Sequence, residues 1–302
     1  MNTVYQFEYQ SHCEMCGEDL SNPVILGQRL SDTQGKSPKR KMGITVSVIK
    51  CRNCGLISPQ PLPIPSNIQQ HYDMLPEEFW DQEYYKLKPD YFNSEITEIK
   101  KLLVTKDKPR ALDIGAGIGK CMISLEKAGF DSYGFEPSRT FYQKAIATMK
   151  MDPEKLKQGA VETIDYPPES FDVITFGAVF EHLYHPAFCL ERAMKWLKPG
   201  GIVHIEVPSS KYFLSRVFNF YYRLRGTNYV TNLSPMHVPY HLYEFSVKSF
   251  ELLGKRLGFH IESQQFNVCE IFHIPGLLKP MFRAYMKATH TGMQLTIYLR
   301  KE

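Results

Sequence analysis

From residue 110 to the end of the 302-residue chain, short apolar runs alternate with segments whose apolar positions repeat at helical spacing. The short runs predict β-strands and the longer segments predict amphipathic helices, because the two elements return side chains to one face at different intervals. The predicted strands are 110–114, 131–135, 171–176, 201–207, 259–266 and 292–300. The predicted helices are 118–129, 138–149, 186–196 and 246–257, the last with Ser246 as its N-cap and Gly258 as its stop. This alternation predicts an α/β fold with a largely parallel sheet and helices on both faces.

The first third of the chain has a different pattern, and we divide it near residue 65. Residues 1–65 contain two cysteine pairs, a polar and basic middle segment (31–43) and the proline-rich stretch SPQPLPIP, which predicts an extended, semi-rigid connector. Residues 66–104 predict a mostly helical extension that includes an amphipathic helix over 93–104. We therefore expect a small cysteine-bearing module, 1–65, before a larger domain, 66–302.

Composition narrows the class of protein. Hydrophobic residues make up 43% of the chain and charged residues 23%, which is typical of a globular protein. Lys and Arg exceed Asp and Glu by 36 − 32 = 4, too small an excess to indicate a nucleic-acid partner. No apolar run approaches the roughly 18 residues of a membrane span, and the start, MNTVYQFEYQ, has no signal-peptide pattern. We expect a cytoplasmic protein.

A glycine-rich segment, ALDIGAGIGK (111–120), follows the first of the predicted parallel strands. The strand carries Asp113, and Gly115, Gly117 and Gly119 follow it. Glycine lets a backbone turn sharply and approach a ligand closely, because no Cβ intervenes. In a doubly wound sheet, such a turn lies at the carboxyl end of a strand, where ligands bind.

The spacing of these glycines separates three ligand classes. A phosphate-binding P-loop needs GxxxxGK followed by Ser or Thr, but Lys120 is followed by Cys121. The dinucleotide fingerprint GxGxxG, started at Gly115, would need a glycine at position 120, which is lysine. Glu136 closes the next strand and can accept hydrogen bonds from two adjacent ribose hydroxyls. Both NAD and S-adenosylmethionine carry such hydroxyls, so Glu136 alone leaves both open.

In this segment an acidic residue and an apolar residue precede GxGxG. That order resembles the first motif of class I S-adenosylmethionine-dependent methyltransferases. The segment 170–209 is similar to the fourth and fifth strands of that family, through its "FD", "EHL" and "LKPGG" features. The resemblance extends from about residue 105 to 302. It implies a Rossmann-like seven-stranded sheet whose last strand, 292–300, is antiparallel, and it implies S-adenosylmethionine as the cofactor.

The resemblance also implies roles for single residues. Asp113, Gly115 and Gly117 would line the methionine end of the cofactor, and Glu136 would hold the ribose. Val161 and Glu162 would lie near the adenine. Residues just after strand four would line the sulfonium pocket, namely Gly177, Ala178 and Phe180. The remaining candidate cofactor-binding residues flank these positions and are Ala116, Gly119 and Pro137.

The cysteine pairs form two matching motifs, CEMCG (13–17) and CRNCG (51–55). Four thiolates arranged as two CxxC pairs can bind one tetrahedral zinc ion, and the alternative is a set of free or disulfide-bonded cysteines. This arrangement before a methyltransferase resembles a bacterial group of methyltransferases with an N-terminal zinc-binding region, several of which act on sugars or glycan precursors. We expect a structural zinc ion, held by Cys13, Cys16, Cys51 and Cys54.

The acceptor side lies in residues 210–245, where related enzymes carry a lid. The aromatic and basic stretch 210–226 could cover an acceptor pocket, lie on a membrane interface beside a lipid-linked substrate, or form an ordinary helix packed on the sheet. Two histidines are candidate general bases, because a histidine can take a proton near neutral pH. They are His182, after strand four, and His241, in the segment MHVPYHLYEFS.

We expect methyl transfer from S-adenosylmethionine to a small-molecule or glycan-precursor acceptor. The alternatives are a methyltransferase acting on RNA or protein and a non-catalytic relative that only binds the cofactor. The sequence does not set the acceptor atom or the oligomeric state.

Overall fold

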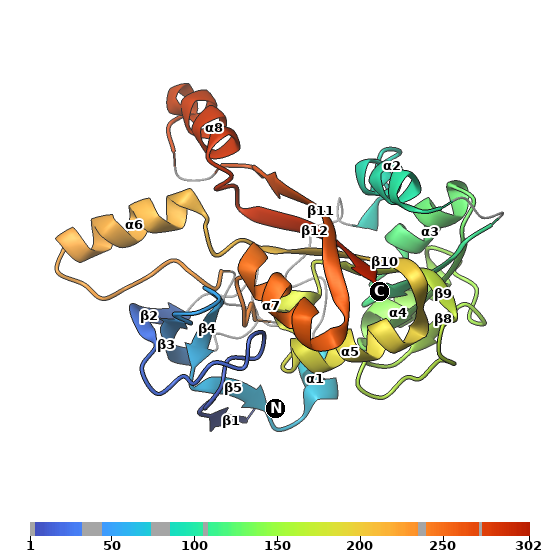
Figure 1. Cartoon of the computed structure of the whole chain (residues 1–302), viewed down its shortest axis with the longest axis horizontal. Helices are drawn as coiled ribbons and strands as arrows, with labels where there is room; N and C mark the ends of the chain where they lie inside the picture. The colour runs from blue at the N-terminus through green and yellow to red at the C-terminus, as the bar shows by residue number, and fades with distance from the viewer. Residues whose placement is uncertain (1–3, 32–43, 74–84, 105–107, 235–239, 272–273) are drawn as a thin grey trace.

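The structure of the chain is a computed structural model that describes residues 4–31, 44–73, 85–104, 108–234, 240–271 and 274–302 (Figure 1). Most of the basic segment 31–43, part of the expected helical extension 66–104 and residue His237 of the histidine segment lie outside the described residues.

A seven-stranded sheet forms the centre of the fold. Its strands are β6 (Arg110–Ile114), β7 (Asp131–Glu136), β8 (Leu156–Gln158), β9 (Phe171–Gly177), β10 (Leu197–Pro208), β11 (Phe259–Asn267) and β12 (Gln294–Lys301). They are ordered β11-β12-β10-β9-β6-β7-β8. β12 runs antiparallel to both neighbours, whereas β8, β7, β6, β9 and β10 pair in parallel. The predicted Rossmann-like sheet with an antiparallel last strand is confirmed.

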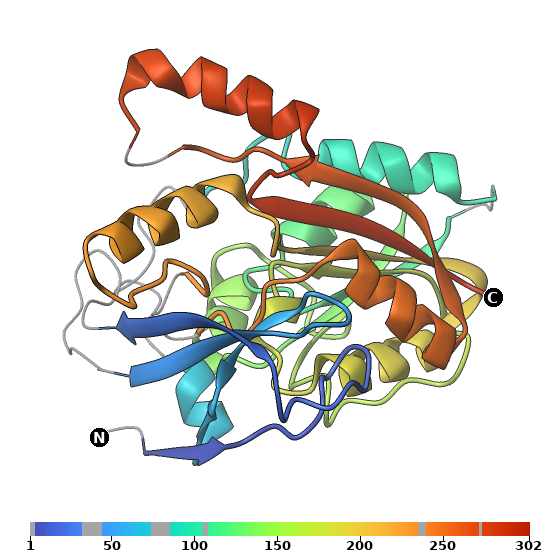
Figure 2. The same ribbon diagram turned by 60° about the vertical axis from the view of Figure 1, so that its left-hand side comes forward.

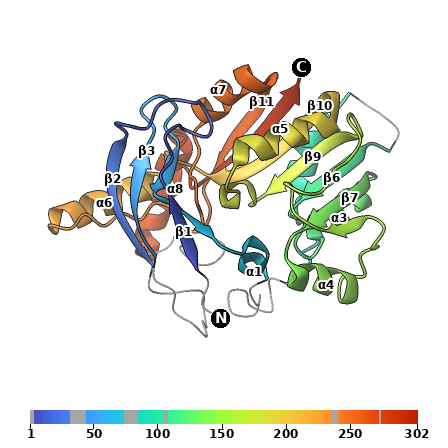
Figure 3. The same cartoon turned by 90° about the horizontal axis from the view of Figure 1, so that it is seen from below.

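Helices cover both faces of this sheet because alternate strand residues point to opposite sides. Val173 and Ile202 belong to a core with α2 (Asn93–Leu102) and α3 (Lys120–Lys127). Their neighbours Ile174 and Val203 belong to the core that contains α5 (Pro186–Trp196) and α7 (Val247–Leu257). Figure 3 shows α5 lying beside β10 and β9. A further helix, α4 (Arg139–Ala147), packs near β7 and β8.

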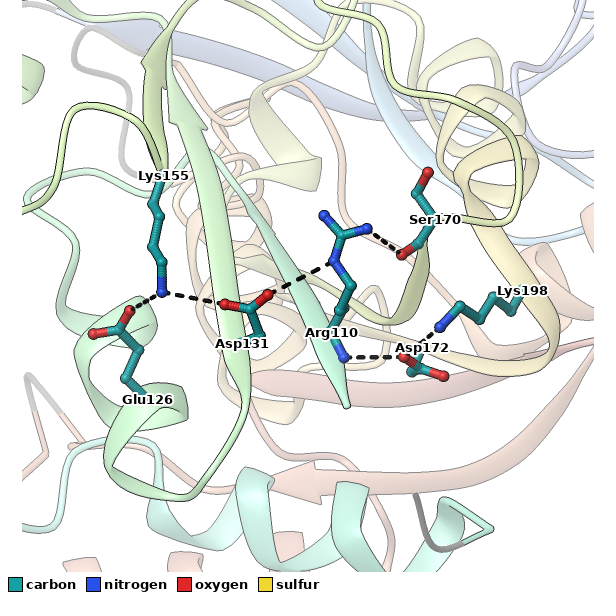
Figure 4. Close-up of polar contacts among 7 residues, drawn as sticks. All are labelled: Arg110, Glu126, Asp131, Lys155, Ser170, Asp172 and Lys198. Atoms are coloured by element: carbon teal, nitrogen blue, oxygen red, sulfur yellow. Dashed lines mark hydrogen bonds and ion pairs between the residues drawn. The ribbon is translucent and has the colours of Figure 1, made fainter. Parts of the chain in front are cut away.

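A charged network joins the amino ends of the parallel strands (Figure 4). Asp131 of β7 forms ion pairs with Arg110 Nε at 3.8 Å and with Lys155 Nζ at 3.2 Å. Asp172 of β9 accepts from Lys198 Nζ at 2.8 Å and from the backbone N–H of Arg110 at 2.9 Å. The network ties the amino ends of β6, β7 and β9 together.

Two small sheets precede this domain. β2 (Val24–Ser31), β3 (Ile44–Lys50) and β4 (Ile57–Gln60) form one, and β1 (Tyr5–Glu8) pairs with β5 (Leu62–Pro65) in the other. The proline-rich stretch is extended, as its prolines predict, but it is not a free spacer. It forms β4 and β5, and the buried side chains of Ser58 and Leu62 hold it against the rest of the fold.

The N-terminal sheets and the insertion 210–245 are packed together. Ile57 and Glu244 exchange two backbone hydrogen bonds of 3.0 Å. Gln28 donates to the carbonyl of Asn228 at 2.7 Å and accepts from the N–H of Val230 at 3.0 Å. The buried residues of both parts belong to one core, so the small module is fused to the larger domain along this seam.

The expected helical extension contains α1 (Ile68–Tyr72) and α2 among its described residues, and residues 89–92 form turns just before α2. Two further helices, α6 (Phe213–Leu224) and α8 (Lys279–Ala288), extend away from the sheet. Two short 3₁₀ turns are η3 (Phe180–His182) and η4 (Gly276–Leu278). None of the helices in the described part of the chain combines the length and apolar composition that a bilayer crossing requires.

Ser246 links a cysteine motif to α7, and its removal should weaken the fold. Its Oγ accepts from the N–H of Ser249 at 3.0 Å, which caps the helix as predicted, and donates to the carbonyl of Cys54. Loss of both bonds in Ser246→Ala should lower the free energy of unfolding by about 1–2 kcal/mol, measured by urea denaturation. The exposed Ser94→Ala variant is the control and should change it by less than about 0.5 kcal/mol. Equal effects in the two variants would contradict this assignment.

Candidate functional site

The glycine loop between β6 and α3 has a backbone that only glycine adopts easily. Gly115, Gly117 and Gly119 have φ values of 71°, 56° and 83°, in the left-handed region. A Cβ on Gly115 would lie 2.6 Å from the Val179 side chain, and one on Gly119 would lie 2.8 Å from Met151. The N–H groups of Gly115 and Ala116 both donate to the carbonyl of Phe135, at 3.0 Å. The loop is therefore fixed against the end of β7.

Glu136 ends β7 beside this loop. Its Oε2 accepts from the N–H of Gly117 at 2.7 Å and its Oε1 accepts from the N–H of Ser138 at 2.8 Å. Burial raises the pKa of Glu136 to about 7, although the two N–H donors act to lower it. The structure thus brings together the carboxylate and the glycine loop that the sequence singled out.

Asp113 lies below the loop, inside the sheet. Thr175 Oγ1, on β9, donates to Asp113 Oδ1 at 2.6 Å. Burial raises the pKa of Asp113 to about 6, against the lowering effect of the hydrogen bonds from Thr175 and Cys121. Its contacts connect β6 to β9, so it supports the loop from the sheet side.

The residues after β9 divide between the surface and the core. Gly177 and Ala178 are exposed, and Ala178 has a φ of 54°, a strained backbone for a residue with a Cβ. Phe180 is fully buried among Phe176, Phe245 and Phe250 and faces the core. The side chain that reaches the glycine loop is Val179, which the motif comparison did not single out.

The candidate adenine residues lie in the loop after β8. Val161 is buried, and its carbonyl accepts from Arg192 Nε at 2.9 Å. Glu162 is exposed and accepts from Cys189 Sγ at 3.7 Å. Their position one strand beyond Glu136 places them on the same edge of the sheet as the glycine loop.

The short helix α1 covers the turn after β7, which sequence reasoning did not foresee. Gln69 Nε2 donates to the carbonyl of Pro137 at 2.7 Å, and Asp73 Oδ1 accepts from the N–H of Arg139 at 2.7 Å. Burial, then the neighbouring Tyr184 and the carboxylate of Glu162, raise the pKa of Tyr72 well above its usual value, and Glu136 adds to the effect. Gln69 and Asp73, on either side of Tyr72 in sequence, bond to the turn that follows Glu136, and they hold Tyr72 near that turn.

His182 and His241 come together beyond the carboxyl end of β9. Their ring centroids are 4.8 Å apart, and His241 Nε2 lies 3.8 Å from the buried carboxyl of Glu181. His182 Nδ1 lies 2.9 Å from the carbonyl of Tyr240. A carbonyl accepts only, so Nδ1 carries the proton and the neutral ring has its lone pair on Nε2. Burial raises the pKa of Glu181 to about 8, and the charge of Glu206 adds to this effect.

An aromatic group adjoins these histidines through Tyr240. Its buried centre is His71, whose pKa is lowered to about 4 by burial and by His182. The rings within 6.5 Å of His71 are Tyr5, Tyr72, Tyr184 and Tyr240. His71 therefore stays neutral near pH 7.

A cavity of about 390 Å³ lies beyond the carboxyl end of β10. Three cations line it, Lys50, Lys211 and Arg216, together with polar side chains that include Asn219 and Asn232, and none of the described residues that line it is acidic. This cavity is at the same edge of the sheet as the glycine loop, where ligands bind in α/β folds.

The four cysteines of the two motifs converge, and one potential ligand atom from each lies within 4.8 Å of the others. Sγ of Cys13 is 3.5 Å from Sγ of Cys54, and Sγ of Cys16 is 3.6 Å from Sγ of Cys51. All seven cysteines of the chain are free of disulfides. Tetrahedral zinc with bonds of about 2.3 Å would separate its sulfur ligands by about 3.8 Å, so the four thiols fit such an ion.

A family model for a methyltransferase domain matches residues 85–264, which is more than half of the chain. The chain is similar to a ubiquinone biosynthesis O-methyltransferase from Ralstonia nicotianae, at 29% identity over 48% of this chain and 59% of that protein. It is similar to a malonyl-[acyl-carrier protein] O-methyltransferase from Halalkalibacterium halodurans, at 33% identity over 32% of this chain and 39% of that protein. The chain spans about half the length of the curated relatives it matches.

Among solved structures, the chain is similar to a SAM-dependent methyltransferase from Methanosarcina mazei. The TM-score is 0.49 at 14% sequence identity, and the match covers 68% of this chain and 96% of that one.

The ionisation of Glu136 should control the affinity for nucleosides. Ribose hydroxyls donate hydrogen bonds, which favour the ionised carboxylate, so the affinity for 5′-methylthioadenosine should rise as the pH increases through about 7. Glu136→Gln should bind at least tenfold more weakly at pH 8 and lose this pH dependence, measured by calorimetry. The exposed Glu154→Gln variant should keep both properties. An unchanged pH dependence in Glu136→Gln would show that Glu136 does not contact the ribose.

Proposed function

Because the chain belongs to the methyltransferase domain family, we propose that it transfers the methyl group of S-adenosylmethionine to a small-molecule acceptor, an anionic glycan precursor. The observation that carries the proposal is the position of Glu136, whose carboxylate accepts from the N–H of Gly117 in the glycine loop and from the N–H of Ser138. When bound, the cofactor supplies an electrophilic methyl group on a sulfonium centre.

The chain's own residues would position the two reactants. Glu136 would accept the ribose hydroxyls, with Gly115, Gly117 and Gly119 allowing close approach of the backbone. The Val179 side chain would limit the space beside Gly115, because it lies 2.6 Å from the position that a Cβ on Gly115 would occupy. Val161 and Glu162 would border the adenine. Holding the acceptor atom in line with the methyl group and excluding water are the main tasks of such a site.

His182 would remove a proton from the acceptor through Nε2. The carbonyl of Tyr240 orients the ring by holding Nδ1–H. Glu181, whose pKa is about 8, is mainly protonated at neutral pH, so it adds no full negative charge beside His241. His241 is 3.8 Å from Glu181 and in ring contact with His182, and it would orient the acceptor or relay the proton.

The cationic cavity supports an anionic acceptor. Lys50, Lys211 and Arg216 would neutralise a phosphate or carboxylate, and Asn219 and Asn232 can bond to hydroxyl groups. Lys50 comes from the N-terminal sheet and the other two from the insertion 210–245. The seam between those two parts would therefore be the acceptor site, which gives the N-terminal module a role in binding the acceptor.

We propose that Cys13, Cys16, Cys51 and Cys54 bind one zinc ion. Four thiolates complete a tetrahedral shell and leave no position for water or substrate, so the ion would be structural. The cysteine motif CRNCG would help to hold the N-terminal module against the larger domain, because Ser246 Oγ donates to the carbonyl of Cys54. The reducing cytoplasm expected from the sequence would keep these thiols available for the metal.

The acceptor class can be tested with a cofactor that carries a labelled methyl group. The chain is incubated separately with nucleoside-diphosphate sugars, phenols, bulk tRNA and a mixture of unfolded proteins. We expect label in the sugar pool, and none with the Gly117→Val variant, because valine does not tolerate a φ of 56°. Label found only in phenols would indicate a phenolic acceptor instead of a glycan precursor. Label in tRNA or protein would overturn the small-molecule proposal.

Replacing His182 should slow the chemical step. We expect His182→Ala to lower kcat at least tenfold, because the proton acceptor is lost, and to leave the cofactor Kd nearly unchanged. The exposed His260→Ala variant, on β11, is the control and should keep full activity. Turnover of His182→Ala equal to that of the unaltered protein would exclude a base role for this residue.

Zinc content should depend on the motif cysteines. The purified protein should contain one equivalent of zinc by elemental analysis, and Cys54→Ser should lose it and unfold at a lower temperature. Cys269→Ser, a cysteine outside the cluster, should keep the metal and the melting temperature. Zinc-free protein with an unaltered melting temperature would refute the assignment.

A further inference from the structure

The two helices α6 and α8 project from the body of the molecule (Figures 1 and 2). They touch near the first turn of α6, where the ring of Phe213 lies 4.6 Å from that of Tyr285 and 6.1 Å from that of Phe282. Leu214 and Met286 are buried at this contact. Beyond it, most residues of both helices are exposed.

The projecting helices carry a concentration of exposed large apolar side chains. Leu277, Met281 and Tyr285 are 91%, 59% and 48% exposed and follow one another at intervals of four, on one side of α8 and the turn before it. Phe220 and Leu224, at the same interval on α6, are 61% and 72% exposed. Exposed apolar residues gathered in this way indicate a contact surface.

The charge of these segments is entirely positive. Residues 207–243 and 271–293 contain no Asp or Glu. Their seven cations are Lys211, Arg216, Arg223, Arg225, Lys279, Arg283 and Lys287. They contribute +7 to a formal net charge of +4, so the rest of the chain sums to −3. These two segments therefore carry only positive charge, and they include the helices whose apolar side chains are exposed.

A groove of about 550 Å³ lies along α6, with Tyr285 of α8 among its lining residues. Phe213, Val217, Phe220 and Tyr285 supply much of its lining, and two arginines, Arg216 and Arg223, also line it. The groove shares Arg216, Asn219 and Thr291 with the cationic cavity beyond β10. A surface that contacts α6 and α8 would therefore lie next to the candidate acceptor site.

We propose that α6 and α8 dock the protein on a bilayer that contains anionic phospholipids. Apolar side chains would enter the interface, and the cations would meet the lipid phosphates. A second copy of the chain fits this surface less well, because two surfaces that carry cations and no Asp or Glu would face each other. Nucleic acid would match the cations but leave Leu224, Leu277 and Met281 without an apolar partner. The proposal does not depend on methyl transfer.

The test is co-sedimentation of the full chain with lipid vesicles in the absence of cofactor. We expect binding to phosphatidylcholine vesicles containing about one third phosphatidylglycerol, and at least tenfold weaker binding to vesicles of phosphatidylcholine alone. Binding should also weaken as the salt rises from about 0.1 M to about 0.5 M. This salt response needs no variant and so does not depend on variant folding.

Two sets of substitutions locate the surface. Lys279→Gln/Arg283→Gln/Lys287→Gln should weaken vesicle binding at least tenfold, and so should Leu277→Ser/Met281→Ser. The matched controls change exposed residues elsewhere and should bind like the unaltered chain. They are Lys127→Gln/Lys150→Gln/Lys255→Gln for charge and Val104→Ser/Phe188→Ser for apolar area. Melting temperatures confirm that each variant is folded.

Several results would overturn the proposal. These are no binding to anionic vesicles, equal binding to neutral ones, or equal losses in the control variants. A dimer that Leu277→Ser/Met281→Ser dissociates, without vesicle binding, would assign the surface to a second copy. Retention of an RNA or DNA duplex without vesicle binding would assign it to nucleic acid.

Discussion

The candidate site depends on one carboxylate held between two backbone N–H groups. Glu136 bonds to Gly117 in the glycine loop and to Ser138 at the start of α4, and so joins β6, β7 and α4 at one point. Burial opposes the ionised form of this side chain, and its pKa rises to about 7. Two further donors, such as a pair of ribose hydroxyls, would relieve that cost. The side chain is therefore poised for a ligand with adjacent hydroxyls.

The rest of the structure places partners along the same edge of the sheet. β9 ends at the histidine pair, β10 ends at the cationic cavity, and α1 covers the turn after β7. The N-terminal sheet supplies Lys50 and the insertion supplies Lys211 and Arg216, so neither part alone makes the cavity. At the opposite edge, Asp131 and Asp172 are saturated with charged partners (Figure 4). The residues proposed to bind ligands thus lie at the carboxyl ends of the strands, and these ion pairs lie at the amino ends.

Much of the larger domain could be predicted because its signals are local. Apolar runs located six strands of the central sheet, and Ser246 and Gly258 marked the ends of α7. β8 has three residues, too few for an alternating pattern, and α8 lies between the last two predicted strands, in a segment for which no element was predicted. The pairing of Ile57 with Glu244 joins residues far apart in sequence, so no local pattern could reveal that the N-terminal module is fused to the insertion.

Within the site, the sequence located backbone positions better than side-chain directions. Gly115, Gly117 and Glu136 lie together as the motif implied, because loop geometry follows from the glycines. Phe180 faces the core because its ring packs against Phe245 and Phe250, and the neighbouring Val179 side chain therefore reaches the glycine loop. Tyr72 was not foreseen as a site residue because α1 has only five residues and its role arises from tertiary packing.

The most direct test of the account is a calorimetric titration of the unaltered protein with S-adenosylhomocysteine and, separately, with NAD. Both ligands carry adjacent ribose hydroxyls for Glu136, but Lys120 occupies the position where a dinucleotide loop needs its third glycine. The account predicts saturable binding of S-adenosylhomocysteine at one site per chain and no binding of NAD. Binding of NAD without binding of S-adenosylhomocysteine would contradict it.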